Sequence, residues 1–304
     1  NQTYFIEENV TVNEGDSLII QPGAILKFSE ESQLIINGYL SAQGTVDNRI
    51  IFDRVSSSET WRGLRFNDSM DDNSIVEYIS INHASNSGIT LDNVDLQLDH
   101  IDINNTMPVQ SVDIDWTYEW GGTALKINNS TISLTNSTIT KNEGSGDNYY
   151  ASGISVNSST LDITNSIVNE NIGYDVYIYE WGDPSIVNLS HCNVSIEGIS
   201  DNNGGQINYL SGNIFSNPLF CNSSESDFHL AENSQCIGNG QDGIDIGAYG
   251  VGCSLIDVLG CVDPIAVNFN PIANLDDGSC NLPFDLGVLE CGITKISEID
   301  TLAG

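Results

Sequence analysis

Aromatic and acidic side chains occur together at two places in the chain, and this mixture is the first candidate for chemistry. Aromatic rings bury large apolar faces, which suits contact with sugar rings, and glycoside hydrolases use paired carboxylates. The acidic partners include Asp113 and Asp175. The mixture therefore predicts carbohydrate contact or hydrolysis, with packing of loop aromatics as the alternative. The aromatic candidates are Trp116, Tyr118, Trp120, Tyr177, Tyr179 and Trp181.

A second group of side chains has the hard oxygen donors that calcium prefers. It falls inside a short segment near the C-terminus that begins and ends with cysteine. The spacing is not that of an EF-hand, and Asp-Pro and Asp-Asp-Gly also form turns without metal. Calcium is the one cofactor we expect, and turn formation is the alternative. The candidate ligands are Asp263, Asn268, Asn270, Asp276 and Asp277.

Basic residues are scarce, which limits the chemistry available. Eight Lys and Arg stand against 42 Asp and Glu, for a formal net charge of −34. Such a field disfavours nucleic acid and anionic surfaces. Arg62 and Arg65 lie near Asp68, Asp71 and Asp72, and we interpret them as salt-bridge partners beside a turn. No apolar run approaches the roughly 18 residues of a membrane span.

The seven cysteines point to an oxidising compartment. No two of them form a CxxC pair, and the histidines show no zinc-ligand spacing. Cys221, Cys236 and Cys253 can pair in more than one way. Cys192 stands apart, so it is a buried thiol or a link to another chain.

Three segments repeat without a gap over 19 positions, and this repetition predicts the fold. They begin at Gly88, Ala124 and Gly153, at offsets of 36 and 29 residues. Apolar residues alternate with Asn, Ser, Thr and Asp, which is the period of a β-strand. One repeat cannot bury its apolar face alone, whereas stacked repeats can. Asn at equivalent corners suits the left-handed conformation and can form a hydrogen-bonded ladder.

We therefore expect an all-β protein, a right-handed parallel β-helix with a small disulfide-bounded C-terminal module. The β-helix takes residues 1–253, including a closing segment over 215–253. The cysteine-rich module and tail take 254–304. A loop with Trp116 should project between Asn105 and Gly122. A β-sandwich is the alternative, but it would not explain repetition in register.

Several motifs resemble secreted right-handed β-helix proteins of the pectate-lyase-like superfamily. They include Ile20-Gln-Pro-Gly-Ala-Ile-Leu-Lys-Phe, Trp61-Arg-Gly-Leu-Arg-Phe and Asp245-Ile-Gly-Ala-Tyr-Gly-Val-Gly-Cys. The segment from Gly260 to Cys280 resembles a cysteine-bounded segment of surface proteins from marine Bacteroidota, many of them exported by type IX secretion. The resemblance implies an extracellular location. A disulfide between Cys261 and Cys280 is the pairing we expect within that segment.

The expected function is a non-catalytic structural or adhesive module of the cell surface, one that can self-assemble into filaments. Its expected partners are further copies of itself or surface glycans, because the two open ends of a β-helix bear unpaired strand edges. The alternative is a carbohydrate-binding protein or a polysaccharide hydrolase or lyase that uses an acidic, aromatic face.

Overall fold

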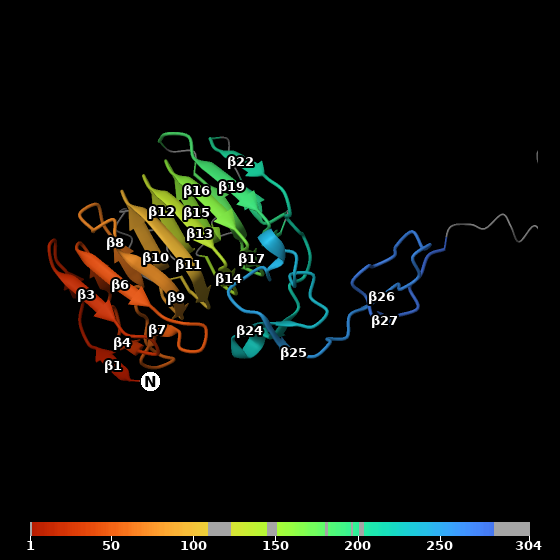
Figure 1. Ribbon diagram of the computed structural model, residues 1–304, viewed down its shortest axis with the longest axis horizontal. Helices are drawn as coiled ribbons and strands as arrows, with labels where there is room; N and C mark the ends of the chain where they lie inside the picture. The colour runs from red at the N-terminus through yellow and green to blue at the C-terminus, as the bar shows by residue number, and fades with distance from the viewer. Residues whose placement is uncertain are drawn as a thin grey trace, which may run out of the picture. The chain divides into compact units, whose positions relative to one another are not determined.

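The computed structural model describes residues 2–108, 123–144, 151–179, 182–195, 197–200 and 204–282. The chain divides into two compact units, Asn1–Ser254 and Leu255–Gly304. The first unit is a parallel β-solenoid of about nine turns, whose strands run side by side in Figure 1. The predicted fold class is confirmed, and the described residues contain no α-helix.

Each turn of the solenoid contributes strands to three faces. Face 1 is formed by β1 (Thr3–Ile6), β4 (Ile25–Phe28), β7 (Ile50–Arg54), the second halves of β9 (Ile75–Asn82) and β11 (Asp95–Asn104), β14 (Thr138–Thr140), β17 (Ile167–Asn169) and β20 (Asn193–Val194). Face 2 is formed by β2 (Val10–Val12), β5 (Leu34–Ile36), β8 (Leu64–Phe66), β10 (Ser87–Asp92), β12 (Thr123–Asn128), β15 (Ala151–Asn157), β18 (Tyr174–Ile178) and β21 (Ile199–Ser200). Face 3 is formed by β3 (Ser17–Ile20), β6 (Tyr39–Gln43), the first halves of β9 and β11, β13 (Thr131–Thr135), β16 (Thr160–Thr164), β19 (Ile186–Ser190) and β22 (Gln206–Tyr209).

The three sequence repeats are three consecutive turns in the predicted register. On face 2, Ile89 pairs with Leu125 and Leu125 with Ile154. On face 3, Leu98 pairs with Leu134, which pairs with Ile163. Face 1 continues the pattern through Ile103, Ile139 and Val168. Because side chains alternate across a strand, equal spacing in the sequence stacks each inward residue on its copy in the next turn.

Apolar columns fill the interior. On face 2 one column runs through Leu34, Leu64, Ile89, Leu125 and Ile154, each at most 1% exposed. Aromatic residues widen the core in the second and third turns. There, Phe28 stacks on the ring of Trp61, with the ring centroids 4.5 Å apart. The core is thus continuous from turn to turn.

In five turns, the chain bends from face 3 to face 1 at one residue whose backbone is in the left-handed conformation, with φ between 49° and 52°. Asn was predicted at such corners, and Asn136 and Asn165 occupy two of them. The other three are Tyr78, His100 and His191. The rings of Tyr78 and His100 stack at a centroid distance of 4.1 Å. Stacking of neighbouring turns therefore also accommodates aromatic side chains in this strained conformation.

Polar side chains inside the corners form ladders along the axis. Ser137 Oγ accepts from Ile101 N, and Ser166 Oγ accepts from Ser137 N. The next position is Cys192, a buried free thiol whose Sγ lies 3.2 Å from Ser190 O. Burial raises the pKa of the Cys192 thiol to about 11. Cys192 thus replaces a ladder serine and is not exposed for a link to another chain.

The closing segment folds back across face 1. Ala248 N donates to Thr138 Oγ1 (3.0 Å), Gly247 N to Asn165 O (2.7 Å), and the Tyr249 hydroxyl to Asp102 Oδ2 (3.0 Å). Its strands are β23 (Phe220–Asn222), β24 (Asp227–Ala231) and β25 (Val251–Cys253), with short 3-10 turns at Ser223–Glu225 and Gln241–Gly243.

Two disulfides are present among the described residues. Cys221 bonds to Cys253, and Cys261 bonds to Cys280 as expected. Cys236, a possible partner on sequence grounds, is a buried thiol instead. It belongs to the apolar cluster of the closing segment with Phe228 and Ile246, and its sulfur accepts a hydrogen bond from Asn193 Nδ2.

The second unit is small and is described over residues 255–282. It contains β26 (Leu259–Gly260) and β27 (Leu275–Asp276), which pair in parallel. The Cys261–Cys280 disulfide closes the loop that contains β27. In the described part of the chain, no helix is long and apolar enough to cross a bilayer.

A buried ladder residue should contribute far more to stability than an exposed one. The Asn142 side chain is fully buried, accepts from Thr106 N and donates to Ile103 O and Thr140 O. We expect Asn142→Ala to lower the free energy of unfolding by roughly 3 kcal/mol, because these buried partners lose their hydrogen bonds. Urea denaturation followed by circular dichroism measures the loss.

Asn188→Ala is the matched control. Asn188 belongs to a ladder on the outer surface of face 3, where it donates to Asp162 Oδ1 and water can replace the lost bond. Asn188→Ala should lower the free energy of unfolding by less than about 1 kcal/mol. Equal losses in the two variants would contradict the buried-ladder account.

Candidate functional site

The N-terminal end of the solenoid has three strands with an unpaired edge. Among the described residues, β1 and β2 are the terminal strands of their sheets and β3 pairs only with β6. The main chain of β1 bonds to β4 through Gln2 O and Ile6 O, so the intervening groups of Thr3 and Phe5 face away. By the same alternation, Thr11 and Ile19 present free N–H and C=O groups. This end can therefore accept further strands.

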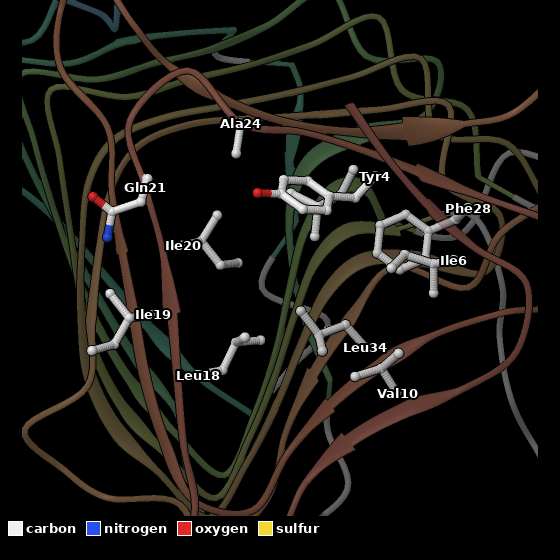
Figure 2. A pocket seen from close by; sticks show the side chains of 11 residues that line it. Tyr4, Ile6, Val10, Leu18, Ile19, Ile20, Gln21, Ala24, Phe28 and Leu34 are labelled. Carbon is white, nitrogen blue, oxygen red and sulfur yellow. The ribbon is translucent and has the colours of Figure 1, made fainter. Parts of the chain in front are cut away.

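An apolar cavity of about 250 Å³ opens at this end. In Figure 2 the Tyr4 ring extends across it, with its hydroxyl group toward Ala24 and Ile20. Of the lining side chains, those of Tyr4 and Gln21 are polar. The lining residues are Tyr4, Ile6, Val10, Leu18, Ile19, Ile20, Gln21, Ala24, Leu26, Phe28 and Leu34.

Among the described residues, no strand pairs with the outer edge of the first turn, and the cavity lies there. Tyr4, Val10 and Leu18 occupy inward positions, in register with Leu26, Leu34 and Leu40. Elsewhere such positions are almost fully buried, yet Tyr4 is 44% exposed and Val10 is 37% exposed. Exposed apolar surface beside unpaired strand edges is a typical site for strand addition.

The segments that connect the strands of the first turn are acidic. Glu7 and Glu8 lie between β1 and β2, and Glu14 and Asp16 lie between β2 and β3. The first basic residue of the chain is Lys27. The cavity lining holds no carboxylate, thiol or imidazole, so its chemistry is that of apolar contact and main-chain hydrogen bonding.

A smaller, polar cavity of about 130 Å³ lies on the outer surface of face 2. Arg62, Arg65 and Lys126 line it, which places three of the eight basic residues of the chain together. Arg62 forms an ion pair with Glu31, and Arg65 with Asp92. The two arginines thus bridge turns of the solenoid, and their partners are not the three aspartates that follow them in the sequence.

The predicted aromatic site is only partly within the described residues. Tyr177 lies on β18 and Tyr179 follows it, with their ring centroids 4.9 Å apart. Tyr177 is 7% exposed, so little of its ring is open for a sugar. The remaining predicted residues, Trp116, Tyr118, Trp120 and Trp181 together with Asp113, lie outside the described residues.

Asp175 is a buried residue near the start of β18 rather than an exposed acid. It is 2% exposed, and its Oδ1 accepts from Asn171 Nδ2 at 2.8 Å. Burial raises the pKa of the Asp175 carboxyl to about 6, against the opposing effect of the Asn171 hydrogen bonds. Its burial makes it unsuitable as the hydrolytic acid considered from the sequence.

The predicted calcium ligands form turns in the second unit. Asp263, Asn270, Asp276 and Asp277 each accept a hydrogen bond from the main-chain N–H two residues later. Asn268 accepts from Asn281 N and donates to Ser279 O. No group of three or more Asp, Glu, His or Cys in the described part of the chain converges as a metal site. Calcium binding by these residues stays a prediction.

The residues that line the cavity were not predicted as a site from the sequence. Val10–Ile20 shows the alternation of strands, but the same alternation occurs in every turn. Residue type therefore does not separate these positions from those of later turns. No family model, curated protein or solved structure matches the chain.

The buried Asp175 should make stability depend on pH in a specific window. Its folded-state pKa of about 6 exceeds the ordinary value of 3.8 for an aspartate, so the folded state binds the proton more tightly. Its contribution to the free energy of unfolding is therefore present below pH 4 and is lost as the pH rises through 6. The loss is about 3 kcal/mol at pH 7.5.

Asp175→Asn should remove this contribution. The difference in unfolding free energy between the wild type and Asp175→Asn should change by about 3 kcal/mol between pH 4 and pH 7.5 in urea titrations. Asp162→Asn, at an exposed ladder position, serves as the control and should leave the profile unchanged. A constant difference between wild type and Asp175→Asn across the range would contradict the raised pKa.

Proposed function

We propose that this chain is a non-catalytic structural and adhesive module of an extracellular assembly, and that its solenoid joins other β-structured chains through the N-terminal end. The observation that carries the proposal is the apolar cavity framed by three unpaired strand edges. Strand addition at this end would satisfy the free main-chain groups and bury the exposed aliphatic and aromatic residues at once.

The extracellular location is supported by chemistry. Two disulfides within 60 residues are consistent with an oxidising compartment. The net charge of −34 keeps such a module soluble and disfavours non-specific contact with nucleic acid. We place the chain with secreted pectate-lyase-like surface proteins of marine Bacteroidota, exported by type IX secretion, on the resemblance of its motifs.

Carbohydrate binding is the second candidate function. The polar cavity with Arg62, Arg65 and Lys126 favours it, since amide, hydroxyl and cationic donors gather there with Asn128 and Thr90. The tyrosines of β18 lie further along the same face. Binding on a glycan array that is lost in Arg65→Gln and Lys126→Gln would support this function.

The proposed association should be visible in the purified protein. We expect the wild type to form elongated assemblies in negative-stain images and to sediment faster as its concentration rises. Tyr4→Glu should sediment as a monomer, because it places a charge in the cavity that an incoming strand must cover. A shift of the apparent association constant by at least tenfold is expected.

Val46→Glu is the matched control, since it adds the same charge at a side chain that is 74% exposed and is not among the residues that line the cavity. It should associate like the wild type. Imaging with calcium and again after chelation tests the expected metal, because loss of assemblies on chelation would place calcium at the joints. A wild type that remains monomeric at every concentration would overturn the proposed function.

A further inference from the structure

The opposite end of the solenoid also has strands with an unpaired edge. Among the described residues, β21 and β22 are the last strands of their sheets. Tyr209 pairs in register with Leu189, and Ile207 with Val187, so both occupy inward positions. Leu189 and Val187 are fully buried, whereas Tyr209 is 50% exposed. Among the described residues of the first unit, this end is therefore a second layer with exposed apolar side chains.

Further apolar residues enlarge this surface. Leu210 is 54% exposed and Phe215 is 46% exposed. The rings of Tyr209 and Phe215 lie together, with centroids 6.2 Å apart. The closing segment thus leaves this layer open, although it covers much of face 1.

The two ends have complementary geometry. Both present three faces, and a strand of the last turn can lie beside the corresponding strand of the first turn: β22 beside β3, and β21 beside β2. Strand direction stays parallel only when the C-terminal end of one copy meets the N-terminal end of another. Ile207 and Tyr209, the inward residues of β22 on face 3, then continue the columns that begin at Leu18 and Ile20 of β3.

The distribution of charge also favours contact between the C-terminal end of one copy and the N-terminal end of another. A joint between two N-terminal ends would bring together two copies of Glu7, Glu8, Glu14 and Asp16, with no basic residue before Lys27 in either chain. The sequence from His191 to Phe215 contains two acidic residues, Glu197 and Asp201, and one histidine. Like charges repel across a joint. Contact between an N-terminal end and a C-terminal end therefore has less electrostatic repulsion than contact between two N-terminal ends.

We propose that the partner of the N-terminal end is the C-terminal end of a second copy of this chain, added head to tail. This inference rests on the proposed function and names its partner. A head-to-tail contact uses two different surfaces and does not close on itself, so repeated addition yields a filament in which the β-strands lie across the fibre axis.

Two complementary variants test the polarity. Tyr4→Glu blocks the N-terminal end, and Tyr209→Glu blocks the C-terminal end. Analytical ultracentrifugation should show each variant alone as a monomer and their equimolar mixture as a dimer. In the mixture, the unmodified C-terminal end of Tyr4→Glu can bind the unmodified N-terminal end of Tyr209→Glu. Val46→Glu should form the same filaments as the wild type, and circular dichroism should confirm that all three variants are folded.

A second pair of variants guards against local misfolding. Thr11→Pro removes an N–H that faces away from β5, and Leu210→Glu charges the other end at an exposed position. They should reproduce the result of the first pair, including the dimer on mixing.

The outcomes separate this inference from the proposed function. If Tyr209→Glu alone still dimerises while Tyr4→Glu does not, two N-terminal ends meet, and the head-to-tail inference fails while the proposed function stands. If the wild type and every mixture remain monomeric, both fail. A mixture that contains only monomers beside a filamentous wild type would also overturn the head-to-tail arrangement.

Discussion

The hydrogen bond between the main chains of successive turns is the interaction on which this structure depends. Every turn of a parallel solenoid satisfies its N–H and C=O groups on its neighbours, so the strands of one turn must match the next in length and register. A slip of one residue would turn an inward Leu or Ile outward. Identical apolar spacing in consecutive turns is the consequence, and it builds the columns that pass through Leu125 and Leu134.

The same requirement explains the buried polar groups. Each corner directs main-chain groups away from the sheets, and ladder side chains such as Ser137 and Asn142 satisfy them from the next turn. Cys192 preserves the pattern with a weaker donor. The ladders and the apolar columns therefore have one origin, the repeated geometry of the turn.

The repeated part of this architecture could be predicted from the sequence because it depends on local alternation. The register of Ile89, Leu125 and Ile154 follows directly from the gapless repeats. The closing segment lacks such periodicity, and for this reason the free thiol of Cys236 and the contact of Tyr249 with Asp102 could not be foreseen. His100 and Tyr78 hold corner positions that residue type alone assigns to Asn.

The candidate site was less predictable, since it is defined by a missing neighbour rather than by residue type. Tyr4 and Val10 resemble core residues everywhere else in the chain, and only their place in the first turn exposes them. Asp175 shows the converse, because an acid that resembled an exposed catalytic group is buried near the start of β18. Residue type alone therefore does not predict whether such a side chain is buried or exposed.

The closing segment changes how the solenoid can come apart. In a stack whose turns contact only their neighbours, opening can begin at either end and spread. Here Arg49 donates to Ala248 O, and Asn193 donates to the sulfur of Cys236, so one segment connects the third turn to the eighth. These turns must open together, whereas the first two can separate alone. The uncovered apolar surface thus lies on the part of the solenoid that opens at least cost and can most readily exchange its hydrogen bonds.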